Sequence, residues 1–136
     1  MRLFLFLVGG IGSRVLRPLI MQLAAGVLPT DDNGNKTPLE LVPIIIDPHK
    51  ANEDLKRTEN LLRNYRKLHN SIYGDKVDVC DGFFAAKIST LSDITANTQD
   101  IPDTFLFNLG SVDSKRFAEF NGFNTLDSAN QALCSM

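Results

Sequence analysis

The sequence predicts an α/β fold built around a mainly parallel β-sheet. Two short apolar runs, each followed by a segment with helical periodicity, are the observations behind this prediction. The predicted order is strand, helix, strand, helix, strand, strand, and such alternation is typical of parallel sheets. At 136 residues, the chain is long enough for one domain, residues 1–136, with its own core.

The first strand and the first helix are predicted from residues 2–25. Residues 2–8 (RLFLFLV) are apolar without alternation, which is typical of a strand buried on both faces. Residues 12–25 form an amphipathic helix, because apolar side chains recur there at three- and four-residue spacing. Gly26 is a natural stop after this helix.

A polar loop at residues 29–38 leads to a second strand at residues 41–46 (LVPIII). Asp47 and Pro48 then open a long helix that ends at Gly74. Its predicted apolar face consists of Ala51, Leu55, Thr58, Leu62, Tyr65, Leu68 and Ile72. His69 is expected to be solvated. Further strands are predicted within residues 82–91 and 104–111, with short helices at 113–120 and 126–135.

The composition excludes several classes of protein. A net charge of −2 gives no basic bias, so we expect no nucleic-acid partner. No stretch reaches the ~18 apolar residues that a bilayer span requires, so we expect no membrane partner and a cytoplasmic location. Cys80 and Cys134 lie too far apart for metal-ligand spacing, and no metal site is expected.

Three glycines mark the turn between the first strand and the first helix. Backbone N–H groups at a helix start carry partial positive charge, and glycines let a phosphate approach them closely. A serine and an arginine follow, which could add a hydroxyl and a cation. The predicted phosphate-binding residues are Gly9, Gly10, Ile11, Gly12, Ser13 and Arg14. The alternative is a tight corner that binds no ligand.

An acidic residue ends the second predicted strand. In nucleotide-binding βαβ units such a residue often holds the ribose hydroxyls, and Asp47 occupies that place. The alternative role for Asp47, which precedes Pro48, is that of an ordinary helix N-cap. No nucleophile–base set and no pair of carboxylates is readable, so the catalytic residues are unknown.

The segments VGGIGSRVLRPLIMQLAAGV and VPIIIDPHKANEDLKRT resemble the amino-terminal phosphate loop of tubulin and its bacterial relatives. They are most similar to the large bacterial proteins described as tubulin-like, over residues 3–68. The resemblance implies that GTP is the ligand, that Gly9, Gly10, Gly12 and Ser13 touch its phosphates, and that Asp47 and Asn52 lie near the ribose. We expect the fold to be a three-layer Rossmann-like sandwich.

The family's second glycine signature, GGGTGSG, is absent from these residues, as is the acidic loop that triggers hydrolysis. GTPase activity would therefore need further carboxyl-terminal segments, and we expect the chain to be the amino-terminal part of a longer protein. Its last residues, LDSANQALCSM, form an apolar helical face without a stop signal. We expect self-association through this face or through an unpaired sheet edge.

Three other functions remain open. The same segments resemble the adenylating enzymes that activate ubiquitin-like proteins, which would make ATP the ligand. A nicotinamide-binding domain would bind NAD, although Val15 occupies the third position of the G-x-G-x-x-G pattern, where that motif has glycine. The remaining alternative is a non-catalytic interaction domain with an empty pocket.

Overall fold

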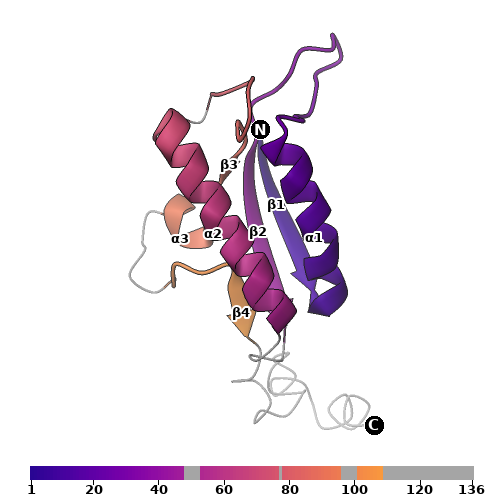
Figure 1. Ribbon diagram of the computed structural model, residues 1–136, viewed down its shortest axis with the longest axis vertical. Helices are drawn as coiled ribbons and strands as arrows, with labels where there is room; N and C mark the ends of the chain where they lie inside the picture. Colours follow the sequence, from indigo (N-terminus) through magenta and orange to yellow (C-terminus); the bar gives the residue numbers. More distant parts are fainter. Residues whose placement is uncertain (48–52, 77, 96–100, 109–136) are drawn as a thin grey trace, which may run out of the picture.

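The structure is a computed structural model that describes residues 1–47, 53–76, 78–95 and 101–108 (Figure 1). Its strands are β1 (Arg2–Val8), β2 (Glu40–Asp47), β3 (Lys87–Ile88) and β4 (Leu106–Asn108). Its helices are α1 (Gly9–Ala24), α2 (Glu53–Tyr73) and α3 (Leu91–Ile94). Every strand pairing in this part of the chain is parallel, so the α/β class and the parallel sheet are confirmed.

β2 is the central strand of the described sheet. It pairs with β1 over seven residues, from Arg2 opposite Glu40 to Val8 opposite Ile46. On its other side, β2 pairs with β3 near its start and with β4 at its end, where Asp47 lies opposite Asn108. β3 and β4 therefore lie on the same side of β2, one beside its start and the other beside its end. In the chain, α3 lies between them.

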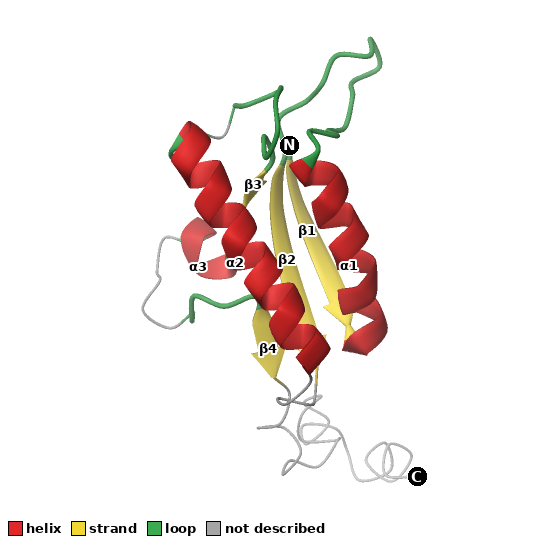
Figure 2. Ribbon diagram, viewed as in Figure 1, coloured by secondary structure: helices red, strands yellow, loops and turns green. Residues whose placement is uncertain are grey.

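Both long helices lie on the same face of the sheet (Figure 2). α1 connects β1 to β2, and α2 leads from β2 toward β3, so both connections step across the sheet in one direction. Right-handed crossovers that step in one direction place their helices on one face. The described residues therefore form two layers, and the second helical layer of a three-layer sandwich is not among them.

The core fills the space between the helices and the face of the sheet that they cover. β1, β2, α1, α2 and the residue before β4 all contribute apolar side chains to it. They include Leu7, Leu16, Ile20, Leu41, Ile45, Leu62 and Phe105. Burial of side chains of this size contributes about 1.5–3 kcal/mol each relative to exposure.

Arg66 on α2 contacts both α3 and the segment that precedes β4. The Arg66 guanidinium lies 2.9 Å from a carboxylate oxygen of Asp93 on α3, and 3.4 Å from one of Asp103, which precedes β4. It also lies 5.8 Å from the centre of the buried Phe105 ring. These contacts tie α3 and the approach to β4 against α2, so that β4 can pair with the end of β2.

The predicted buried face of α2 is wrong at its carboxyl-terminal end. His69 is only 1% exposed, and its Nδ1 lies 2.8 Å from the Phe84 carbonyl oxygen. Leu68 and Ile72 are instead 45% and 54% exposed. The next buried residue after Tyr65 is therefore four positions later rather than three, which still fits a helix with 3.6 residues per turn. A histidine can be buried at this position because its ring nitrogen has a carbonyl oxygen as hydrogen-bond partner.

The prediction that β1 is buried on both faces is also wrong. Alternate side chains face away from the helices, and Phe4, Phe6 and Val8 are 45%, 64% and 72% exposed. The reason is that α1 and α2 cover only one face and β1 is the outermost strand of the described sheet. In β1, the continuous run of apolar residues therefore corresponds to an exposed apolar surface on the face of the strand that α1 and α2 do not cover.

The remaining element predictions differ in detail. α1 begins at Gly9 rather than residue 12 and so includes all three glycines of the turn. α3 was not predicted, although Thr90 and Asp93 have the spacing of a capping box and the Thr90 N–H donates to Asp93 Oδ2 at 2.7 Å. The helices expected at 113–120 and 126–135 lie outside the described residues.

Glu40 on β2 links β1 to the residue that follows β3, at the amino edge of the sheet. Its carboxylate accepts hydrogen bonds from Arg2 Nε at 2.6 Å and from Ser89 Oγ at 2.8 Å. Burial acts to raise the pKa of Glu40, but the hydrogen bonds from Arg2 and Ser89 outweigh it and hold this pKa below its usual value of 4.5. The carboxylate form is therefore favoured by folding.

We predict that Glu40→Gln lowers the free energy of unfolding at pH 7 by about 1 kcal/mol. A lowered carboxyl pKa stabilises the fold above the unfolded-state pKa, and this stabilisation is lost as the pH falls through the folded-state pKa. Urea unfolding at pH 7 and pH 3 should therefore show a smaller difference between the two proteins at pH 3. Glu53→Gln, at an exposed position on α2, is the control; an equal loss in both variants would contradict the role of Glu40.

Candidate functional site

The carboxyl edge of the sheet brings together the ends of β1, β2 and β4 and the starts of α1 and α2 (Figure 1). The register places Val8 opposite Ile46, and Asp47 opposite Asn108. The glycine turn and Asp47 therefore lie at the same edge. In open parallel sheets, ligands bind outside the carboxyl ends of the strands, which makes this edge the candidate site.

The start of α1 is the candidate anion-binding turn. Val8 is the N-cap in extended conformation (φ −100°, ψ 124°), and its side chain makes no capping hydrogen bond. The first turn of α1 contains no acidic residue. Gly9 has φ +69°, and a Cβ built there would meet no atom within 4 Å. Glycine is thus required at this position for its backbone conformation, and the space beside it is open.

Gly12 has a different role from Gly9. A Cβ at Gly12 would lie 3.0 Å from the backbone carbonyl carbon and Cα of Leu7. Glycine therefore lets α1 approach β1 closely, which is a packing role that requires no ligand. The glycines of the turn are not equivalent, and the substitution of Gly12 tests packing rather than binding.

The other predicted residues of the turn belong to the first turns of α1. Ile11 is 79% exposed, and Ser13 lies within the first turns of α1. The Arg14 side chain is 74% exposed, and its guanidinium lies 3.9 Å from Asp54 Oδ2 at the start of α2. An exposed pair at this distance contributes little to stability, so Arg14 can turn toward an anion at low energetic cost.

Asp47 lies at the end of β2 and is 6% exposed. The register of β2 places it at the same edge of the sheet as the glycine turn. Asn52 lies outside the described residues, as do residues 48–51.

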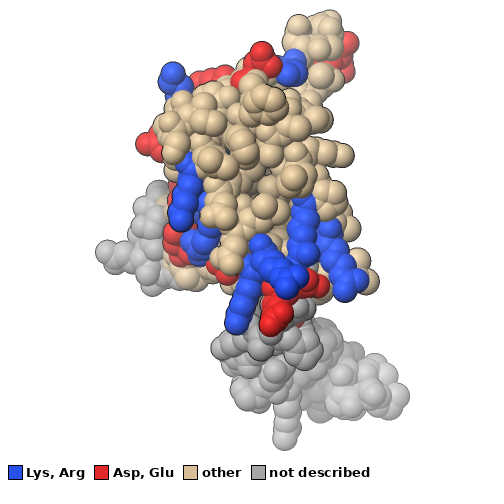
Figure 3. Space-filling model, in the orientation of Figure 1, with Lys and Arg blue, Asp and Glu red and all other residues tan. Residues whose placement is uncertain are grey.

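Arg17 is a structural residue that the sequence interpretation missed. It donates from Nε to Thr58 Oγ1 at 3.0 Å and from Nη2 to the Asp54 carbonyl oxygen at 2.7 Å. Its Nη2 also lies 3.1 Å from Asp54 Oδ1. The sequence feature that could have indicated this role is the position of Arg17 directly after Leu16, on the border of the buried face of α1. Figure 3 shows Lys and Arg side chains gathered with acidic ones over the starts of α1 and α2.

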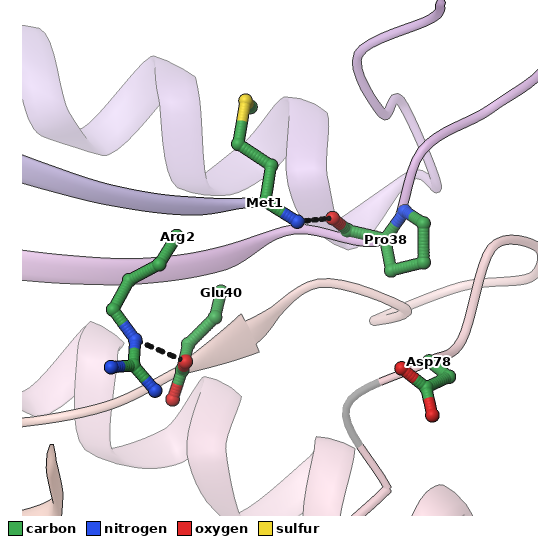
Figure 4. Close-up of a pocket in the computed structure, with 5 residues that line it drawn as sticks. All are labelled: Met1, Arg2, Pro38, Glu40 and Asp78. Atoms are coloured by element: carbon green, nitrogen blue, oxygen red, sulfur yellow. Dashed lines mark hydrogen bonds and ion pairs between the residues drawn. The ribbon is translucent and has the colours of Figure 1, made fainter.

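A pocket at the opposite, amino edge of the sheet is lined by Met1, Arg2, Pro38, Glu40 and Asp78 (Figure 4). Four of these residues bond in pairs: the Met1 ammonium donates to the Pro38 carbonyl oxygen at 2.7 Å, and Arg2 pairs with Glu40. Seven residues of extended strand, about 20 Å, separate this pocket from the glycine turn. It is not part of the candidate site.

Two further findings concern the described residues. No group of three or more His, Cys, Asp and Glu side chains in this part of the chain could hold a metal ion. Nor does any helix within it combine the length and the apolar character that crossing a membrane requires.

We predict that Gly12→Val destabilises the protein by about 1–3 kcal/mol, because its branched side chain cannot fit between α1 and the Leu7 backbone. Arg14→Val places the same side chain at an exposed position of the same helix and serves as the control. Thermal unfolding should show a clearly lower midpoint for Gly12→Val alone. Equal midpoints for the two variants would contradict close packing at Gly12.

No protein-family model, no curated protein and no solved structure matches this chain. The function proposed below therefore rests on the geometry of the carboxyl edge and on the residues that occupy it.

Proposed function

We propose that this chain is a nucleotide-binding domain that holds phosphates at the turn formed by residues 9–13. The observation that carries the proposal is Gly9: its backbone is left-handed, and the space beside it is open at the start of a 16-residue helix. Phosphates bind at such helix starts because the backbone N–H groups there carry partial positive charge. GTP is the first candidate, by the resemblance to the tubulin phosphate loop, with ATP and NAD as alternatives.

The residues around the turn supply the rest of the proposed site. Arg14 is exposed and close enough to the start of α1 to pair with a phosphate oxygen. Asp47, at the end of the neighbouring strand, would accept hydrogen bonds from the ribose hydroxyls. Asn52, also near the ribose in the tubulin-like arrangement, completes the proposed set.

The proposed activity is binding rather than hydrolysis. No catalytic set was readable in the sequence, so we assign no reaction to the carboxyl edge. GTP hydrolysis would require the additional segments expected from the tubulin-like family. A cytoplasmic location agrees with the nucleotide as ligand.

A complete three-layer Rossmann-like sandwich is part of this proposal. The helices α1 and α2 cover one face of the sheet, while Phe4, Phe6 and Val8 leave an apolar surface on the other. A second helical layer over these side chains would remove that surface from water, in the way that such layers cover parallel sheets.

A second candidate function is that of an interaction domain that binds no nucleotide. The packing of Gly12 against Leu7 favours it, because this contact explains one of the three glycines without any ligand. An interaction domain does not explain the left-handed backbone and the open space at Gly9, and nucleotide binding is therefore the first candidate.

The decisive experiment is thermal unfolding with millimolar GTP, ATP, NAD or inorganic triphosphate. A ligand at ten times its Kd stabilises the folded state by about 1.4 kcal/mol, which raises the midpoint by a few degrees. We expect Gly9→Ala and Arg14→Gln to reduce the shift for GTP and for triphosphate alike. Arg57→Gln removes the same charge from an exposed position of α2 and should leave both shifts unchanged.

Asp47→Asn separates ribose recognition from phosphate recognition. An amide is a poorer partner for ribose hydroxyls than a carboxylate, so the GTP shift should fall while the triphosphate shift stays. If no ligand shifts the midpoint of the unmodified protein, the nucleotide-binding proposal is wrong and the interaction domain remains.

A further inference from the structure

The outer edge of β1 carries backbone groups that no described residue pairs. The Glu40 N–H donates to the Met1 carbonyl oxygen at 2.8 Å, which shows that odd-numbered residues of β1 turn their backbone groups toward β2. Because these directions alternate along a strand, the N–H and C=O groups of Phe4 and Phe6 point toward the outer edge. This edge is therefore ready to pair with another strand.

This edge lacks the features that normally prevent strand pairing. Natural edge strands carry charges, prolines or bulges. Residues 3–8 contain neither a charge nor a proline, and their pairing with β2 is regular. The one charge on β1 belongs to Arg2, and Glu40 of the same chain neutralises it at 2.6 Å. Two copies of this edge would meet without charge repulsion.

The flank of α1 above the same edge is also apolar. Arg17 reaches α2, and Val15 lies two residues away, about 200° around the helix, so Val15 faces away from α2. Ile11 lies one turn before Val15 on the same flank. Ile11 is 79% exposed and Val15 is 61% exposed. The outer side of the molecule thus combines an unpaired strand with an apolar helix flank.

We propose that β1 pairs antiparallel with β1 of a second copy of this chain, around a two-fold axis at Leu5. In this register, Phe4 lies opposite Phe6 of the partner subunit and Leu3 opposite its Leu7. The outward backbone groups of Phe4 and Phe6 then form hydrogen-bonded pairs, as the antiparallel pattern requires.

The strand's own sequence is the argument for a second copy rather than another partner. Around Leu5 the sequence LFLFL is symmetric, so the two-fold axis brings like side chains together on each face. Both copies keep their helices on the same side of one continuous sheet. The Ile11 and Val15 flanks of the two α1 helices then face each other across the axis. This pairing uses the strand edge and the helix flank, and it does not depend on nucleotide binding.

Sedimentation equilibrium across a concentration series, without nucleotide, tests the pairing. We expect a reversible dimer whose Kd rises at least roughly tenfold in Phe6→Lys, because a charge enters a strand edge that must desolvate. Phe83→Lys is the matched control, since Phe83 is similarly exposed (70%) and belongs to the turn before β3, which pairs with β2 rather than with β1. Circular dichroism should show that both variants keep their secondary structure.

Cross-linking tests the register. In a Cys80→Ser, Cys134→Ser background, Leu5→Cys places two thiols on the two-fold axis, with Cα atoms about 4.5 Å apart, within disulfide range. Leu3→Cys is the control, because the two copies of that residue lie about 14 Å apart in this register. Mild oxidation should therefore link the Leu5→Cys protein into dimers and leave the Leu3→Cys protein unlinked.

Three results would overturn the proposal. The first is a monomer at every concentration. The second is a dimer that Phe6→Lys does not weaken, which would place the interface elsewhere. The third is equal cross-linking of the two cysteine variants, which would exclude this register.

Discussion

The parallel pairing of β1 with β2 is the constraint on which the rest of the structure depends. Parallel neighbours cannot be joined by a tight turn, so the chain must cross over the sheet, and α1 forms that crossover. A right-handed crossover places α1 over one face and returns β2 in the direction of β1. The turn at Gly9 and the end of β2 at Asp47 consequently meet at one edge, although 38 positions of sequence separate them.

The contact between Gly12 and Leu7 makes this arrangement tight. A helix that begins directly after its strand must fold back over it within a few residues, and a side chain at Gly12 would hold the two elements apart. Arg17 then joins α1 to α2 through Thr58 and Asp54. Packing thus explains Gly12 and Arg17, but it does not explain the open, left-handed Gly9.

Local patterns predicted the elements that long periodic segments encode. β1, α1, β2 and most of α2 follow from apolar spacing, and the carboxyl-edge position of the turn and Asp47 follows from their order. The burial of His69 was not predictable from spacing alone, because it depends on the Phe84 carbonyl, fifteen residues away. The exposure of Phe4 and Phe6 depends on which face the helices cover, and a strand's own sequence does not contain that information.

The candidate site was predictable in position but not in the roles of its members. The three glycines look alike in the sequence, yet Gly9 is required for its backbone conformation and Gly12 for close packing. The short α3 was missed although its capping-box spacing was present, because four residues give too little periodicity to recognise.

The central claim is that phosphates bind at the turn between β1 and α1. Amide chemical shifts in a ¹⁵N-labelled protein, followed while GTP is added, test it residue by residue. The account predicts saturable shifts at Gly9, Gly10, Ile11 and Gly12 and at Asp47, with little change at the amino edge around Arg2 and Glu40. Shifts confined to the amino edge, or no shifts at millimolar GTP, would contradict it.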